Sequence, residues 1–310
     1  MAEFVQYLIN GITLGSIYGL VAVGYTMVFG IIGMVNFAHG EVFMIGAVTS
    51  LIIYVTITSL IGFAAGAVFI ALMICLAAAI LLTSLLNLVI EKIAYRPLRG
   101  SFRLAPLISA LGMSYALKNF VNVFQYEYGS NKSVPSILTG HISLITDENG
   151  FEAVLNYKNI LIIVVTAIML GIFWYLVQKT PLGRAQRSCE QDRKMAALLG
   201  IDVDRTIAVT FGLGAALAAV AGVLYLLFYS SISYNDGTIP GLKAFTAAVL
   251  GGIGSLPGAV LGGLLIGLIE IMWSGYISSD YKDVAVFAVL IIVLILMPQG
   301  ILGKPDVEKV

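Results

Sequence analysis

Residues 36–41 interrupt two long apolar runs with an amide, an imidazole and a carboxylate, carried by Asn36, His39 and Glu41. Ionisable side chains at such positions in a membrane protein are costly, and they are candidates for function. Glu41 could bind an ammonium group and Asn36 could donate to a carboxylate, while Gly40 could open the helix so that backbone groups line a pathway. The same residues would also suit a capped loop at the membrane surface, with Glu41 in the favourable first turn of the next helix. The sequence leaves both interpretations open.

A second interruption places helix-breaking residues inside another apolar segment. These residues are Gly251, Gly252, Gly254, Pro257 and Gly258. Irregular backbone at membrane depth is tolerated where protein or a water-filled cavity satisfies its polar groups. Half-helix ends of this kind bind ions and the charged groups of transported compounds. A tight hairpin between two short helices would explain the same residues, so both interpretations stay open.

The third feature is a charged, amphipathic stretch over residues 184–199, which is far too polar to cross a membrane. Its composition predicts a helix, and Gly200 is expected to end it. A short helix held at the membrane surface offers a rigid element for the groove of a partner protein. The alternative is a connector whose basic residues lie against anionic lipid.

Two series of glycines repeat every four residues, a spacing that lets a neighbouring helix approach closely. They are Gly11, Gly15 and Gly19 near the N-terminus, and Gly254, Gly258 and Gly262 near the C-terminus. We expect both series to mark faces of helix packing.

Glu270 is a further acid inside an apolar segment. The nearby Trp273 and Tyr276 are typical of the membrane interface. We therefore expect the Glu270 side chain to extend toward that interface.

The elements that position these residues follow from composition. The 310 residues are 59% hydrophobic and 11% charged, whereas soluble domains carry about 25% charged residues. Several continuous apolar runs reach the roughly 20 residues that a membrane helix needs, without the alternation of barrel strands. The sequence therefore predicts an all-α polytopic membrane protein with about eight transmembrane helices in a single domain, 1–310. The expected spans are 5–32, 41–61, 64–90, 104–124, 159–178, 206–230, a broken or re-entrant pair within 242–273, and 284–298.

Lys and Arg in the connecting loops predict the orientation of the chain. They gather in loops 91–103 and 179–205, which we expect on the cytoplasmic side. Loop 125–157 holds one lysine against four acidic residues and is rich in turn residues, and it is expected to be the largest extracytoplasmic loop. An even number of passes within 242–273, such as two half-depth helices, then brings the C-terminus to the cytoplasm.

Several classes of function are disfavoured. The formal net charge of zero gives no polycationic surface for nucleic acid. The sequence contains no phosphate-binding loop and no grouping of nucleophile, base and metal ligands. We therefore expect no catalytic residues, no metal and no cofactor in this chain, and any nucleotide must be bound by another chain.

Four segments in this order carry a specific resemblance: residues 10–20, 35–41, 180–185 and 249–258. Together they resemble the permease family of branched-chain amino acid ABC importers, specifically the shorter of its two paralogous permeases. The resemblance implies a subunit of the bacterial inner membrane that translocates hydrophobic amino acids. It also implies a second permease subunit, an extracytoplasmic binding protein, and two cytoplasmic ATPase subunits that bind ATP and Mg²⁺. Related permeases carry urea, short amides or other neutral amino acids.

The resemblance also implies that the cytoplasmic loop inserts a coupling helix into a cleft of the ATPase. The positions that fall there are Arg184, Arg187, Glu190, Asp192, Ala196, Ala197 and Gly200. The family pattern raises the expectation that Asn36, His39 and Glu41 lie near the translocation path. A stand-alone secondary transporter or channel is the rival class, and it would need a buried ion relay.

Overall fold

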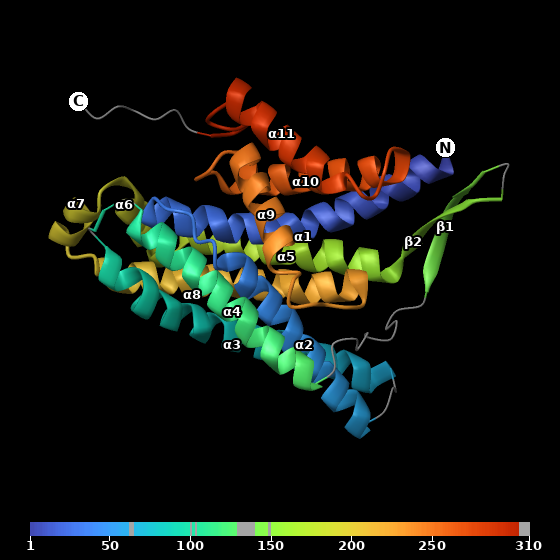
Figure 1. The fold of residues 1–310 in the computed structure, drawn as a ribbon, viewed down its shortest axis with the longest axis horizontal. Coiled ribbons are helices and arrows are strands. Elements are labelled where there is room, and N and C mark those ends of the chain that lie inside the picture. The colour runs from blue at the N-terminus through green and yellow to red at the C-terminus, as the bar shows by residue number, and fades with distance from the viewer. Residues whose placement is uncertain (62–64, 100, 103, 129–139, 148–149, 304–310) are drawn as a thin grey trace.

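The computed structural model describes the chain except for residues 62–64, 100, 103, 129–139, 148–149 and 304–310. The described part is a bundle of helices lying close to one long axis (Figure 1). Six of these helices are long and apolar enough to cross a membrane. They are α1 (Ala2–Ile32), α2 (His39–Ile61), α3 (Ala65–Ile90), α5 (Tyr157–Lys179), α8 (Val203–Tyr229) and α10 (Leu256–Tyr276).

Two further helices follow predicted spans, and one short helix completes the bundle. Helix α4 (Ala105–Tyr128) is less apolar than the six long helices, and α11 (Lys282–Leu296) is shorter. Helix α9 (Thr238–Gly251) is shorter still. The predicted class, an all-α polytopic membrane protein, is confirmed, and the helix bounds fall within a few residues of the expected spans.

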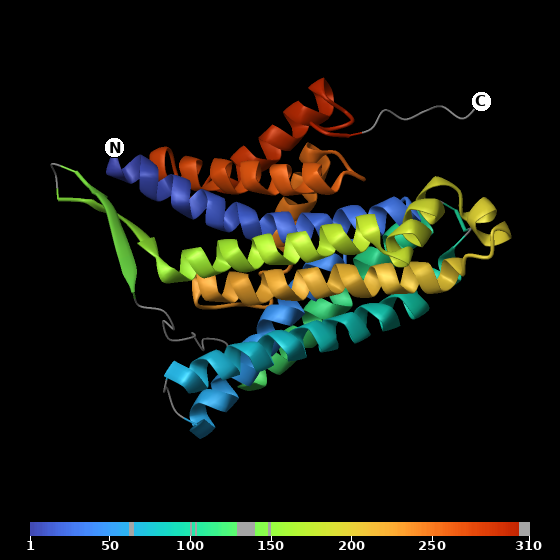
Figure 2. The same ribbon diagram turned by 180° about the vertical axis from the view of Figure 1, so that it is seen from behind.

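Helix α1 is the centre of the bundle. Every residue from Thr13 to Val28 is buried, because α8, α9, α10 and α5 all pack against this helix. Helices α2, α3 and α4 lie on one side of the layer that contains α1, and α10 and α11 lie on the other (Figures 1 and 2). A helix that is apolar all round, as α1 is, is suited to this position.

The packing of α10 against α1 depends on glycine. Gly11, Gly15 and Gly19 face Leu268, Leu264 and Val260 in turn, so the two helices run antiparallel. A Cβ added to Gly267 would lie 2.3 Å from the Cα of Gly15. In the second glycine series, Gly258 and Gly262 face α9 instead of α1.

The broken pair differs from two half-depth helices. Helix α10 has 21 residues, about 32 Å, which is long enough to cross the hydrocarbon core. Helix α9 has 14 residues, about 21 Å, and is steeply inclined to the long axis (Figure 1). The predicted break within 242–273 is present, but the two helices are unequal, and α10 is longer than the half-depth helix expected as one possible arrangement.

Residues 141–156, within the predicted loop 125–157, form an antiparallel hairpin that the sequence analysis did not predict. Strands β1 (His141–Thr146) and β2 (Glu152–Asn156) pair, and Gly150 adopts a left-handed conformation in their turn. The Gln6 side chain accepts a hydrogen bond from the Val154 N–H at 2.8 Å, which fastens the hairpin to α1. Residues 129–139 of the predicted loop lie outside the described residues.

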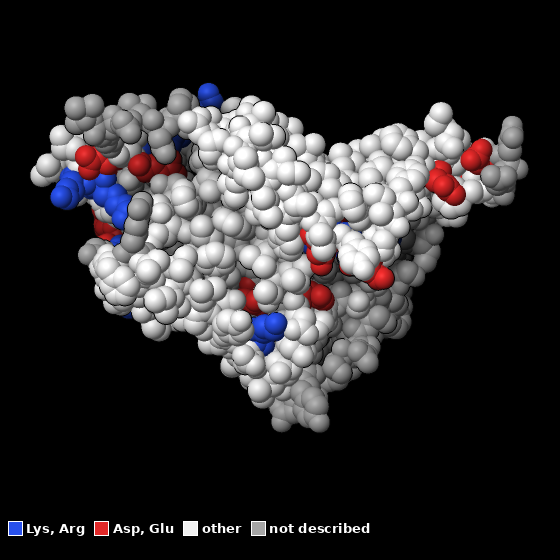
Figure 3. Space-filling view, turned by 45° about the horizontal axis from the view of Figure 1, so that its top comes forward, with Lys and Arg blue, Asp and Glu red and all other residues white. Residues whose placement is uncertain are grey.

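The opposite end of the bundle carries the short helices η1 (Glu91–Tyr95), η2 (Arg96–Leu98), α6 (Pro181–Gln191) and α7 (Arg193–Leu198). The prediction of one helix over 184–199 is wrong, because Asp192 is extended and caps a new helix. Its carboxylate accepts hydrogen bonds from the N–H groups of Lys194 and Met195. Figure 3 shows that charged side chains gather at the ends of the molecule and in one group between them.

Replacing Gly267 by alanine is expected to destabilise the protein by about 1–3 kcal/mol, because the new methyl group would force α10 away from α1. Thermal unfolding of the purified protein in detergent measures the effect. Gly112→Ala on α4 is the matched control, since its added Cβ would meet nothing within 4 Å. Equal unfolding temperatures for the two variants would contradict the proposed role of this contact.

Candidate functional site

A pocket of about 190 Å³ lies between α1, α2, α4 and α9. It brings Phe37, Gly40 and Glu41 of the predicted 36–41 site together with residues of α4 and α9, which are far away in the sequence. Its lining residues are Tyr25, Phe37, Gly40, Glu41, Leu111, Ser114, Tyr115, Lys118, Gly237, Thr238, Gly241 and Leu242. The pocket therefore combines a carboxylate, a cation and hydroxyl groups with apolar walls.

Glu41 is the buried acid of this pocket, with 1% of the residue exposed. Its Oε1 accepts hydrogen bonds from the hydroxyls of Thr238 at 2.9 Å and Ser114 at 3.3 Å. Its Oε2 has no hydrogen-bond partner among the described residues and lies against Gly237. The N-terminal ends of α2 and α9 both lie beside this carboxylate, and helix N-termini favour negative charge.

Gly40 allows α9 to approach α2. A Cβ on Gly40 would lie 2.5 Å from the carbonyl oxygen of Gly237 and 2.9 Å from the Cα of Gly241. A larger residue would therefore push the first turn of α9 away from Glu41. Gly40 thus lines the pocket and also holds Thr238 within reach of the carboxylate.

Asn36 and His39 lie behind the pocket and do not line it. The Asn36 side-chain oxygen accepts hydrogen bonds from the Tyr95 hydroxyl at 2.6 Å and the Ala38 N–H at 3.1 Å. This arrangement shapes the turn before α2 and ties it to η1. The His39 ring is fully buried between Gly24 and Gly214, and its edge packs on Tyr25.

The glycine and proline break forms a tight hairpin between α9 and α10. A Cβ on Gly251 would lie 1.9 Å from the carbonyl oxygen of Gly258, so the two backbones touch. Gly252 and Gly254 adopt left-handed conformations, and Pro257 lies in the first turn of α10. The N–H groups of residues 301 and 302 donate to the carbonyls of Leu250 and Gly251, both at 2.9 Å, which satisfies the end of α9.

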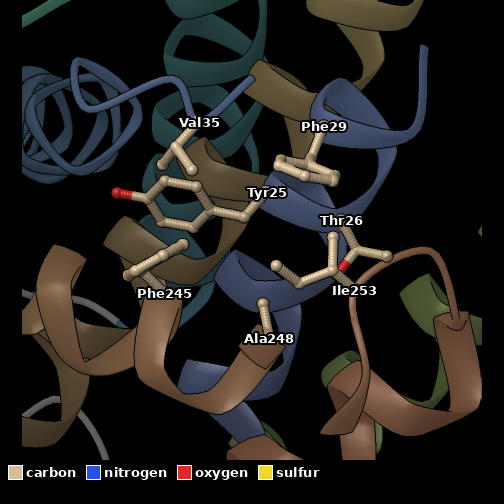
Figure 4. Close-up of a pocket in the computed structure, with 7 residues that line it drawn as sticks. All are labelled: Tyr25, Thr26, Phe29, Val35, Phe245, Ala248 and Ile253. Atoms are coloured by element: carbon tan, nitrogen blue, oxygen red, sulfur yellow. The ribbon is translucent and has the colours of Figure 1, made fainter. Parts of the chain in front are cut away.

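A second, smaller pocket lies between α1, α9 and the hairpin (Figure 4). Tyr25 lines both pockets, and its ring lies between Val35 and Phe245 in the close-up. Ile253 of the hairpin lines the second pocket. Of the break residues predicted for the pathway, Gly251, Gly252, Gly254, Pro257 and Gly258, none lines either of these two pockets. Pro257 lines a third pocket of about 510 Å³ between α1, α5 and α10.

Glu270 forms a buried charge cluster that sequence reasoning missed. Only 2% of this residue is exposed, so the prediction that it extends to the interface is wrong. Lys243 on α9 donates a hydrogen bond to Glu270 at 2.7 Å and forms an ion pair with Asp283 at 2.6 Å. The Tyr18 hydroxyl also donates to Glu270 at 2.9 Å. The sequence does carry a signal for this cluster, because the cation Lys243 lies in the same apolar segment, 242–273, as the acid Glu270.

Helix α6 contacts the ends of two long helices, α1 and α5. Glu190 on α6 packs on Gly30 near the end of α1, and Gln186 donates to Glu190 at 3.1 Å. Arg187 donates to the carbonyl of Val177 on α5. At the same end, Arg99 forms ion pairs with both Glu91 and Asp204, which joins η1 to α8.

The remaining predicted coupling residues lie at or near the surface of this end. Ala196 is buried, whereas Arg184, Asp192, Ala197 and Gly200 are exposed. Leu198 and Leu199 are each 81% exposed. Gly200 adopts a left-handed conformation, and the N–H of residue 201 donates to the Ala196 carbonyl, which ends α7 as predicted.

Cys189 lies on the buried side of α6. Burial raises the pKa of its thiol, so the thiol stays protonated at neutral pH. A protonated, buried thiol is a poor nucleophile and a poor metal ligand.

The six long apolar helices define the class, a multi-pass membrane protein. The chain belongs to the family described as branched-chain amino acid transport system / permease component, whose model matches residues 7–294. Relatives are similar over almost the whole chain. The high-affinity branched-chain amino acid transport system permease protein LivH of Salmonella typhimurium is 48% identical over 313 residues, covering 99% of this chain and 98% of that protein.

The LivH protein of Escherichia coli K12 and the BraD protein of Pseudomonas aeruginosa, a permease of the same description, are also 48% identical. In both cases the match covers 99% of this chain and 98% of the relative. No solved structure matches the chain.

Replacing Lys243 by methionine is expected to destabilise the protein by about 3–5 kcal/mol, because Glu270 and Asp283 would lose the cation that they share. The double variant Lys243→Met/Glu270→Gln should recover part of that loss. Thermal unfolding in detergent measures both variants, with Lys92→Met at an exposed position as control. A double variant no more stable than the single one would contradict the pairing.

Proposed function

We propose that this chain is a membrane-spanning permease subunit of an ATP-driven importer for branched-chain amino acids, placed in the bacterial inner membrane. The observation that carries the proposal is the 48% identity over 99% of the chain to permeases named for branched-chain amino acid transport. The internal pocket supports it, because a carboxylate and a cation beside apolar walls suit a hydrophobic amino acid.

The importer would contain a paralogous second permease, two cytoplasmic ATPase subunits and an extracytoplasmic binding protein. ATP and Mg²⁺ would be bound by the ATPase subunits, so this chain would itself be no enzyme. The exposed Leu198 and Leu199 at the end of α7 support a cytoplasmic partner, because such apolar residues are suited to insertion into a groove.

Coupling would pass from α6 to α1. Glu190 packs on Gly30 of α1, and about one and a half helical turns earlier the same helix carries Tyr25, which lines both pockets. A displacement of α6 by the ATPase would therefore reach the pockets through one continuous helix. The translocation pathway would then alternate between an outward opening and an inward opening.

The translocation path would include the pocket at Gly40 and Glu41. Asn36 and His39 would support it by holding the start of α2 in place. The glycine hairpin at 251–258 would contribute indirectly, since it sets the position of α9 and hence of Thr238.

A related importer for urea, short amides or other neutral amino acids is the first alternative. A stand-alone secondary transporter is the second, and the buried cluster of Lys243, Glu270 and Asp283 is the observation that favours it. Reconstitution separates the classes. Uptake of leucine that requires ATP, the ATPases and the binding protein supports the importer, whereas ion-driven uptake by this chain alone would refute it.

The double variant Leu198→Asp/Leu199→Asp should reduce association with the ATPase subunits at least about tenfold, because two buried carboxylates would oppose docking. Copurification of the ATPases and their substrate-stimulated activity measure the loss. Leu144→Asp, exposed on the outer hairpin, is the control. Normal ATPase activity in the double variant would refute the assignment of α7 to coupling.

A further inference from the structure

Glu41, which lines the first pocket, has one carboxylate oxygen without a hydrogen-bond partner among the described residues. Thr238 and Ser114 both bond to Oε1 of Glu41, while Oε2 has no hydrogen-bond partner among the described residues. A buried, unpartnered carboxylate oxygen is costly unless a water molecule or a ligand supplies the missing donor. The pocket has space for such a ligand, since its volume of about 190 Å³ is several times the roughly 30 Å³ of one water molecule.

The cation of the pocket lies on α4, close to Glu41 but not paired with it. Lys118 lines the pocket and interacts electrostatically with Glu41. Among the described residues, no ion pair joins the two side chains. Ser114, which donates to Glu41, precedes Lys118 by four residues, so the two side chains share one face of α4 about 5–6 Å apart. The positive and negative groups of the pocket are therefore neighbours with a gap between them.

The apolar part of the pocket wall comes from α4 and α9, the helices that carry Ser114 and Thr238. Leu111 lies three residues before Ser114 on α4, and Leu242 lies four residues after Thr238 on α9. Each leucine is thus one helical turn from a hydroxyl that bonds to Glu41. Phe37 adds an aromatic ring to the same lining.

We infer that this pocket is a binding station for a zwitterionic α-amino acid during translocation. The Glu41 carboxylate receives the ligand's ammonium, and the Lys118 ammonium receives its carboxylate. Leu111, Leu242 and Phe37 contact an aliphatic side chain. This inference rests on the proposed importer function and narrows its cargo, because urea and uncharged amides would leave both charges of the pocket without partners.

The test assigns each charged residue to one group of the ligand. Radiolabelled leucine is bound to the purified complex of both permeases and the ATPases, without the binding protein. The competitors are leucinamide, which lacks the carboxylate, and 4-methylpentanoate, which lacks the ammonium. Wild type should prefer leucine over each competitor by at least about tenfold. Lys118→Met should lose the discrimination against leucinamide alone, and Glu41→Gln the discrimination against 4-methylpentanoate alone.

Glu3→Gln and Lys92→Met, at exposed positions outside the pocket, are the matched controls and should discriminate as wild type does. Should Glu41→Gln fail to fold, Lys118→Met decides the test, because Lys118 is only partly buried. Unchanged discrimination in the folded variants, or no leucine binding to wild type at millimolar concentration, would overturn the inference. The proposed function fails separately, if the complete importer with its binding protein takes up no leucine with ATP.

Discussion

Direct contact between helix backbones, made possible by glycine, is the constraint on which the rest of this structure depends. Helices in lipid gain little from hydrophobic burial against one another, so close packing must supply much of their association. Gly15 and Gly267 bring α10 against α1, and Gly251 and Gly258 bring α9 against α10. Gly40 then brings α2 against the start of α9. This chain of contacts fixes where Thr238 meets Glu41, and so it fixes the pocket.

The long helices could be predicted from the sequence because a membrane span needs a continuous apolar run, and such runs are visible locally. The inclination of α9 could not be predicted, because it follows from glycine contacts with two other helices. The break at Asp192 was missed because composition favours helix on both sides, and the capping bonds to residues 194 and 195 outweigh continuation. The hairpin of β1 and β2 was missed because both strands are short.

The candidate site was predictable in part. Glu41 could be predicted because an acid between apolar runs is unusual, and Gly40 because a glycine beside these polar residues can open the helix. Ser114, Lys118 and Thr238 gave no local signal, since a serine, a lysine near a helix end and a threonine at a helix start are all common. Their importance comes from contacts that bring α2, α4 and α9 together, with Thr238 lying 197 positions beyond Glu41 along the chain. Sequence spacing within a single helix cannot reveal such a meeting.

The two groups of charges inside the bundle are satisfied in opposite ways, and the contrast bears on function. In the cluster around Glu270, Lys243 forms ion pairs with two acids, and Tyr18 donates a hydrogen bond to one of them. Those charges compensate one another, which suits a permanent link between α1, α9, α10 and α11. In the pocket, Glu41 and Lys118 face the same space without pairing, and Glu41 keeps one oxygen without a hydrogen-bond partner. Opposite charges that are held apart in a low-dielectric site gain most from a ligand that carries both complementary charges. The helix packing that stabilises the bundle therefore also keeps its binding station unsatisfied until such a ligand arrives.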